Sequence, residues 1–132
     1  MKLKLIKMKN VFSTNDLALK LIKKKMLKPT LITSIKQSKG RGTMGKKWIS
    51  LKGNLFFSIY FAVNKTRLNY KQFAILNAYI LKKIISEVVN TKIKINIKWP
   101  NDLLIGNKKI CGILQEVIHF NEQTFLIIGA GI

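Results

Sequence analysis

Acidic residues are scarce in this chain of 132 residues: five aspartates and glutamates stand against 25 lysines and arginines, for a formal charge of +20. Such a charge is typical of proteins with anionic partners such as nucleic acid. All but two of the basic residues are lysines, however, and they are spread from Lys2 to Lys109 among many isoleucines and asparagines. This spread favours a compositional bias of the solvated positions, so the charge alone identifies no ligand.

Cysteine and long apolar runs are also scarce. Cys111 is the single cysteine, which excludes an internal disulfide and fits a reducing compartment. The longest nearly apolar stretch, Leu55 to Val63, is interrupted by Ser58 and is far shorter than the roughly 20 residues of a membrane helix. The first ten residues alternate lysine with apolar side chains, unlike the continuous apolar segment of a secretory signal. We therefore expect a cytoplasmic protein that does not span a membrane.

The hydrophobic pattern predicts one α+β domain. Apolar residues recur at helical spacing in two segments, which predicts helices from residue 13 to about 27 and from 70 to 89. Runs rich in β-branched and aromatic residues predict strands at 30–35, 54–63, 92–99, 103–105, 109–118 and 124–132. With one more strand ahead of the first helix, the order β-α-β-β-α-β-β-β-β is that of an α+β fold whose late strands form antiparallel hairpins.

The strand at 92–99 has a period of two. Ile93, Ile95, Ile97 and Trp99 alternate with polar residues, so we expect these four side chains to share one apolar face of the strand. Pro100 should end it.

The segment GRGTMGKKW, residues 40–48, matches two phosphate-binding patterns at once. Gly40, Gly42 and Gly45 have the spacing G-x-G-x-x-G of dinucleotide sites. Gly40, Gly45 and Lys46 match all but the last position of the nucleotide phosphate loop. The two interpretations exclude each other, so the surrounding sequence has to decide.

Neither pattern has the context that its chemistry needs. A strand-like segment follows the last glycine, and no acidic residue lies between Asp16 and Glu87 to bind a ribose. Lys47 stands where the nucleotide loop has a magnesium-binding Ser or Thr. What remains is a glycine loop that carries Arg41, either an anion site or a solvated connection.

The turn Gly106-Asn107 predicts a tight hairpin. A two-residue turn pairs Asp102 with Cys111 and places Asp102 and Lys109 on one face, roughly 7–8 Å apart at Cα. We therefore expect their carboxylate and ammonium to meet, either as a surface ion pair or as part of a site.

Five motifs then occur in order: STN at 13–15, KQSKGRGTMGKKW at 36–48, KWPND at 98–102, KKICGILQE at 108–116 and GAGI at 129–132. Together they resemble the ordered motifs of biotin–protein ligases. That family makes biotinyl-adenylate from biotin and ATP with Mg²⁺, and transfers biotin to a lysine of the carrier domain of a biotin-dependent carboxylase, here expected to be acetyl-CoA carboxylase. The resemblance implies a core like that of class II aminoacyl-tRNA synthetases, a mostly antiparallel sheet with flanking helices.

The resemblance also implies roles for individual residues. Biotin would contact Ser13, Thr14, Gln37, Gly40, Arg41, Lys109 and Gly112. ATP and the adenylate would contact Arg41, Gly42, Lys46, Trp48, Asn101 and Lys109. Arg41 and Lys109 would offset the charge of the reacting anions, Asp102 would position or deprotonate the acceptor lysine, and no protein ligand to a metal is expected. Helix capping by Ser13 or Thr14, and a core position for Trp48, are the structural alternatives.

The chain departs from the family in three respects. Thr43 replaces a second arginine of the glycine loop, so we expect looser retention of the adenylate. No helix-turn-helix segment precedes Ser13, so we expect no DNA binding. The family continues beyond Ile132 with catalytic structure and a small barrel, so we expect residues 1–132 to be a catalytic domain that is truncated at its C-terminus.

Other functions stay open at this point. A truncated remnant would bind biotin without activating it, and a lipoate–protein ligase would have a similar fold. A basic nucleic-acid-binding module would use the charge of +20, although two arginines are few for reading base edges. An exposed sheet edge would allow a homodimer.

Overall fold

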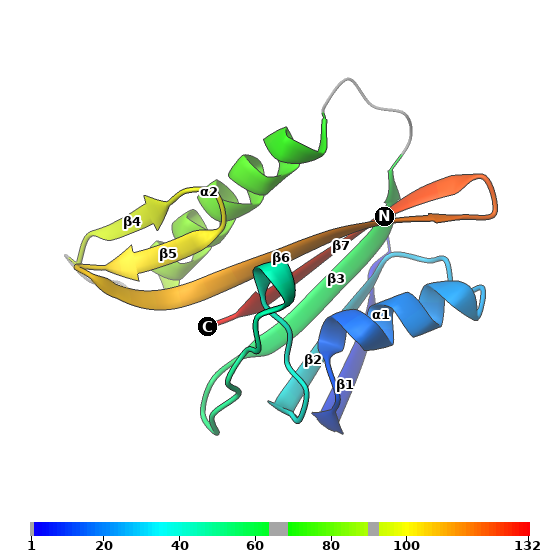
Figure 1. Cartoon of the computed structure of the whole chain (residues 1–132), viewed down its shortest axis with the longest axis horizontal. Helices are drawn as coiled ribbons and strands as arrows, with labels where there is room; N and C mark the ends of the chain where they lie inside the picture. The colour runs from blue at the N-terminus through cyan, green and yellow to red at the C-terminus, as the bar shows by residue number, and fades with distance from the viewer. Residues whose placement is uncertain (1, 64–68, 90–92) are drawn as a thin grey trace.

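The structure, a computed structural model, describes residues 2–63, 69–89 and 93–132. These residues form one seven-stranded sheet with the order β1-β2-β3-β7-β6-β5-β4 (Figure 1). The strands are β1 (Lys4–Val11), β2 (Thr30–Gln37), β3 (Phe56–Val63), β4 (Ile95–Lys98), β5 (Asp102–Ile105), β6 (Lys108–Phe120) and β7 (Gln123–Gly131). The β1 and β2 pair is parallel, and the other neighbours are antiparallel. The α+β class, the element order and the mostly antiparallel sheet are confirmed.

Two helices and a short 3₁₀ turn complete the described chain: α1 (Thr14–Lys23), α2 (Tyr70–Val89) and η1 (Thr43–Gly45). The helix predicted at 70–89 is confirmed, whereas α1 ends four residues before the predicted residue 27. The reason is a helix-terminating turn, in which Lys25 has a φ of 61° and the Met26 N–H donates to the Leu21 carbonyl at 3.0 Å. Among the residues that the structure describes, no helix is long and apolar enough to cross a membrane.

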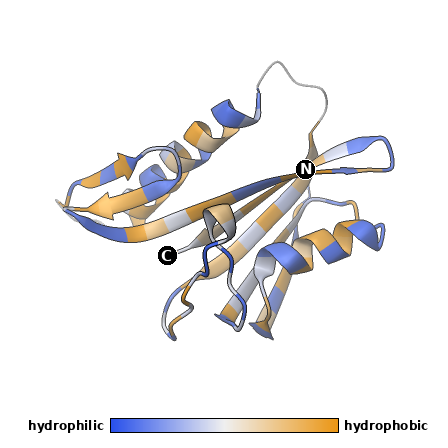
Figure 2. Ribbon diagram, in the orientation of Figure 1, coloured by the Kyte–Doolittle hydropathy of each residue, from blue (hydrophilic) through white to orange (hydrophobic). Residues whose placement is uncertain are grey.

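The two helices pack against opposite faces of the sheet (Figure 1). Because successive side chains of a strand point to opposite sides, one strand contributes residues to both cores. On β7, Phe125 and Ile127 pack with α1, whereas Leu126 and Ile128 belong to the core under α2. We call these two sides the α1 face and the α2 face. Figure 2 shows the strands and both helices as mixtures of apolar and polar residues, as expected for elements with one buried side.

The hairpin of β5 and β6 has a register that the turn alone did not predict. A β-bulge lies between Leu103 and Leu104, so Leu103 pairs with Cys111 and Asp102 pairs with Gly112. The predicted pairing of Asp102 with Cys111 is therefore wrong by one residue, because β6 contains one extra residue at the bulge.

The strand predicted at 92–99 is shorter in the structure, and most of its apolar face is exposed. Residue 92 lies outside the described residues, and β4 is a four-residue edge strand in which Ile95 is 4% exposed and Ile97 is 37% exposed. Trp99 is 71% exposed in the turn after β4. A short edge strand with one covered residue buries less than its period of two suggests, although Pro100 follows its end as expected.

Candidate functional site

Three glycines leave the α1 face of the central strands bare. Gly112 of β6 pairs with Gly131 of β7, and Gly129 pairs with Leu114. A Cβ on Gly112 would lie 2.5 Å from the ring of Trp48, and a Cβ on Gly131 would collide with the same ring. Strand glycines of this kind allow another group to approach the backbone closely. We call this bare surface, made by Gly112, Gly129 and Gly131, the glycine floor.

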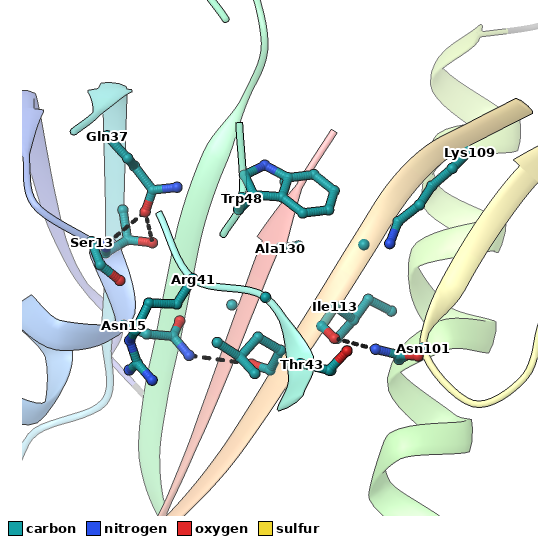
Figure 3. Close-up of a pocket in the computed structure, with 16 residues that line it drawn as sticks. Ser13, Asn15, Gln37, Arg41, Thr43, Trp48, Asn101, Lys109, Ile113 and Ala130 are labelled. Atoms are coloured by element: carbon teal, nitrogen blue, oxygen red, sulfur yellow. Dashed lines mark hydrogen bonds between the residues drawn. The ribbon is translucent and has the colours of Figure 1, made fainter. Parts of the chain in front are cut away.

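A cavity of about 40 Å³ lies on the glycine floor (Figure 3). Its wall includes nine of the predicted site residues: Ser13, Thr14, Gln37, Arg41, Gly42, Trp48, Asn101, Lys109 and Gly112. Figure 3 shows Ser13, Asn15 and Gln37 on one side, Lys109 and Asn101 on the other, and Trp48 between them. Residues far apart in the sequence thus converge on one site.

The side of the cavity at the start of α1 is neutral and hydrogen-bonded. Thr14 donates to Gln37 Oε1 twice, from its backbone N–H at 2.8 Å and from its hydroxyl at 3.1 Å. The Ser58 hydroxyl lies 2.7 Å from Thr14 Oγ1 and also contacts Asn15 Oδ1. Thr14, Asn15 and Ser58 are buried. This side therefore presents fixed donors and acceptors without a net charge.

The capping alternative applies to one residue of the pair. Ser13 caps α1, since its hydroxyl accepts from the Asp16 N–H at 3.3 Å. Thr14 instead turns its hydroxyl toward Gln37. Ser58 and Asn15 were not predicted as site residues; the one signal for Ser58 was its interruption of the most apolar stretch of the sequence.

The opposite side of the cavity is cationic. Lys109 Nζ lies 2.7 Å from Asp102 Oδ1 and 5.0 Å from the centre of the Trp48 ring. The predicted ion pair is confirmed despite the bulge, and the ammonium contacts both a carboxylate and an aromatic face. Among the described residues, the buried Trp48 Nε1 has no hydrogen-bond partner. The indole therefore lies on the glycine floor as a cover, held by packing and the cation.

Arg41 lies beside the neutral side and is held by acidic residues. Its guanidinium pairs with Glu116 at 2.8 Å and with Asp16 at 2.8 Å. The side-chain hydrogen bond to Glu116 raises the pKa of Arg41, an effect that burial partly opposes. Together with Asp102, three of the five acidic residues of this basic chain pair with cations at this site. Neither Asp16 nor Glu116 was predicted, although the scarcity of acidic residues was a usable signal.

Three predicted residues do not line the cavity. Gly40 lies at the base of the loop, where a Cβ would lie 2.6 Å from the Trp48 carbonyl oxygen. Asp102 contacts the Lys109 ammonium without lining the cavity, and Lys46 is exposed on the loop. Their contribution is to the shape or the charge around the site rather than to its wall.

The glycine loop is itself a small hairpin. The Gly42 N–H donates to the Lys46 carbonyl at 2.7 Å, and the Trp48 N–H donates to the Gly40 carbonyl at 2.9 Å. Met44 at its tip has a φ of 55° and is 95% exposed. No helix follows the loop, in agreement with the exclusion of both phosphate-loop patterns.

Known proteins have similar sequences and a similar fold. The profile of the biotin/lipoate A/B protein ligase family matches residues 8–132. The bifunctional ligase/repressor BirA of Bacillus subtilis is 36% identical over 105 residues, which cover 78% of this chain and 32% of BirA.

Two solved structures are similar over almost the whole chain. The biotin acetyl coenzyme A carboxylase synthetase from Helicobacter pylori, with bound biotinylated ATP, has a TM-score of 0.83 at 28% identity, covering 99% of this chain and 61% of that one. The biotin protein ligase from Aquifex aeolicus, in complex with biotin and ATP, has a TM-score of 0.78 at 33% identity, covering 98% and 51%. The chain thus spans about a third of the length of BirA and between half and two thirds of the two solved chains.

Proposed function

This chain belongs to the biotin/lipoate A/B protein ligase family, and on that premise we propose that its cavity activates biotin with ATP and transfers it to a protein lysine. The observation that carries the proposal is the polarity of the cavity. A neutral, hydrogen-bonding side at Thr14 and Gln37 faces a cationic side at Lys109 across the glycine floor. Biotin has the matching polarity, with a neutral ureido ring at one end and a carboxylate at the other.

The neutral side would hold the ureido ring. This ring offers N–H donors and a carbonyl acceptor, and Ser13, Thr14 and Gln37 carry groups that complement both. Ser58 and Asn15 would act behind them by fixing the Thr14 hydroxyl. Pre-set hydrogen bonds of this kind reduce the entropy that binding has to overcome.

The cationic side would carry the chemistry. An oxygen of the biotin carboxylate attacks the α-phosphorus of ATP, the bond to the leaving pyrophosphate breaks, and biotinyl-adenylate forms. Two anions approach each other in this step, and Lys109 would offset the charge that develops between them. Asp102, at 2.7 Å from Lys109 Nζ, would hold the ammonium in place at this side of the cavity.

Transfer would follow at the same place. The neutral amine of the acceptor lysine attacks the acyl carbon, and AMP leaves with the bonding electron pair. Because a protonated amine is no nucleophile, Asp102 would also position the acceptor lysine and draw off its proton. We propose the carrier domain of a biotin-dependent carboxylase, acetyl-CoA carboxylase in the first instance, as the acceptor, and the cytoplasm as the compartment.

The nucleotide would enter beside the loop. Trp48 would stack on adenine, with Gly42, Lys46 and Asn101 near the phosphates and the ribose. Asn101 is tied to β6 by a hydrogen bond from its Nδ2 to the Ile113 carbonyl at 3.0 Å. In the described residues, no group of three or more His, Cys, Asp or Glu side chains has the arrangement of a metal site. Mg²⁺ is therefore proposed only as a counter-ion of ATP, and no step above uses it.

The proposal is tested by the choice between two acids. The chain is incubated with ATP, Mg²⁺ and either biotin or lipoate, and the acyl-adenylate is identified by mass spectrometry. We expect biotinyl-adenylate and no lipoyl-adenylate. Formation of lipoyl-adenylate alone would assign the chain to the lipoate branch, and biotin binding measured by calorimetry without any adenylate would identify a binding remnant.

A further inference from the structure

The guanidinium of Arg41 is held by two protein carboxylates. Its Nη1 donates to Glu116 Oε1 at 2.9 Å, and its Nη2 contacts Glu116 Oε2 and Asp16 Oδ1, each at 2.8 Å. Glu116 Oε2 also accepts from Asn15 Nδ2 at 2.8 Å. Two carboxylates around one guanidinium leave a net charge of about −1. A phosphate that approached this cluster would meet repulsion, so the side chain is poorly arranged as an anion clamp.

The direction of the side chain agrees with this assignment. Figure 3 shows the guanidinium of Arg41 beside Asn15, on the far side of the cavity from Lys109. Glu116 lies on the α1 face of β6, two and four residues beyond Leu114 and Gly112 of the cavity wall. The arginine thus reaches back to the elements that form the neutral side, away from the cation that faces the reacting groups.

The attachment of the glycine loop to the rest of the molecule depends on few side chains. Hydrogen bonds within residues 40–48 shape the hairpin but do not fasten it. In the described part of the chain, contacts with the body come from Arg41, through its ion pairs, and from Trp48, through the glycine floor and Lys109. Loss of either contact therefore weakens the attachment of the loop to the rest of the molecule.

We propose that Arg41 is a positioning residue whose side chain anchors the glycine loop over the cavity through Glu116 and Asp16. Lys109 rather than Arg41 then faces the reacting carboxylate and phosphate, which revises the catalytic role expected of Arg41. Glu116 forms the stronger half of the anchor, because it binds both guanidinium nitrogens and is less exposed than Asp16, 26% against 45%. The ion pairs of Arg41 alone support the anchor, whereas the measurement of adenylate formation rests on the proposed function.

Limited trypsinolysis measures the anchor without any reaction. Lys46 and Lys47 are exposed on the loop, so their cleavage reports its detachment. We expect Glu116→Gln, which keeps the size but removes the charge, to speed this cleavage about fivefold, the size of one lost ion pair. Asp16→Asn, the matched control on the same guanidinium, should have a smaller effect. Equal cleavage rates in Glu116→Gln and the unchanged chain, at equal thermal stability, would overturn the anchor.

A charge swap separates anchoring from catalysis. Arg41→Glu and Glu116→Arg should each expose the loop to trypsin and lower biotinyl-adenylate formation, whereas the double variant should recover most of both. A double variant with a protected loop and no adenylate would show that the guanidinium itself takes part in the reaction, and would overturn the proposal. If the unchanged chain forms no adenylate, the proposed function fails, and trypsinolysis still decides on the anchor.

Discussion

The two faces of the central strands differ although they share one backbone. On β7, Gly129 and Gly131 form part of the glycine floor, while Leu126, Ile128 and Ala130 point into the aliphatic core under α2. At the glycine floor, the α1 face leaves space and buries hydrogen-bonded hydroxyls and amides, whereas farther along β7 Phe125 and Ile127 pack with α1. The α2 face fills space with apolar side chains. At this end of β7, alternation thus separates the residues that fill the core under α2 from those that form the site.

The largest expected effect concerns the reactivity of Cys111, which is buried on the α2 face. Burial, the main cause, raises the pKa of this thiol to about 12 from an ordinary value of 9.0. At pH 8 the folded chain therefore holds about a thousandfold less thiolate than the unfolded chain. Reaction with a disulfide reagent should be slower by at least this factor, and the comparison in urea measures it. Fast labelling of the folded chain would contradict a closed α2 face.

Shortening a buried side chain on the α2 face should lower the stability of the fold. Leu126 is 0% exposed, so Leu126→Ala should lower the free energy of unfolding by roughly 2–5 kcal/mol, because it removes contacts and leaves a cavity. Urea denaturation gives this value. Ile35→Ala, at a position that is 59% exposed, is the matched control and should change it by about 0.5 kcal/mol or less. Similar losses in both variants would show that burial under α2 does not determine the cost of removing a side chain.

Filling the glycine floor should disturb the site more than the fold. The Cβ of Gly131→Ala would collide with the Trp48 ring, so we expect the indole to leave the floor and its emission to shift to longer wavelength. A Trp99→Phe background removes the second tryptophan, which is 71% exposed.

Ala130→Gly changes one methyl group on the opposite face of the same strand and should leave the emission unchanged. Unchanged emission in Gly131→Ala would show that Trp48 does not depend on a bare floor. Biotin binding to the two variants should follow the same order as the emission, with the larger change in Gly131→Ala.

The smallest expected effect concerns Thr43, which lines the cavity where a second arginine was expected. We propose that Thr43→Arg slows the release of adenylate up to about fivefold, the size of an exposed ion pair. Met44→Arg adds the same charge at a neighbouring side chain that is 95% exposed, and should not slow release. Labelling of bystander proteins by the intact enzyme measures the effect. Equal labelling by both variants would show that Thr43 does not affect retention of the adenylate.

Local patterns in the sequence predicted much of this structure, because α2, β7 and the element order depend on periodicity and turns near each residue. The pair of Asp102 and Lys109 was also predictable, since a one-residue error in register still leaves both side chains within reach. The anchor was not, because Glu116 lies 75 residues from Arg41. The exposure of Trp99 depends on an edge strand whose neighbours no local pattern specifies.

The central claim is that Lys109 faces the reacting anions on the α1 face. The most direct measurement compares biotinyl-adenylate formation by the unchanged chain, Lys109→Ala and Lys108→Ala, with the biotin affinity of each determined by calorimetry. Lys108 is the exposed neighbour of Lys109 on β6 and keeps the total charge of the two variants equal. We expect Lys109→Ala to lower the rate of formation by about 10²–10³, and Lys108→Ala to leave it unchanged. Equal rates in the two variants would contradict the account.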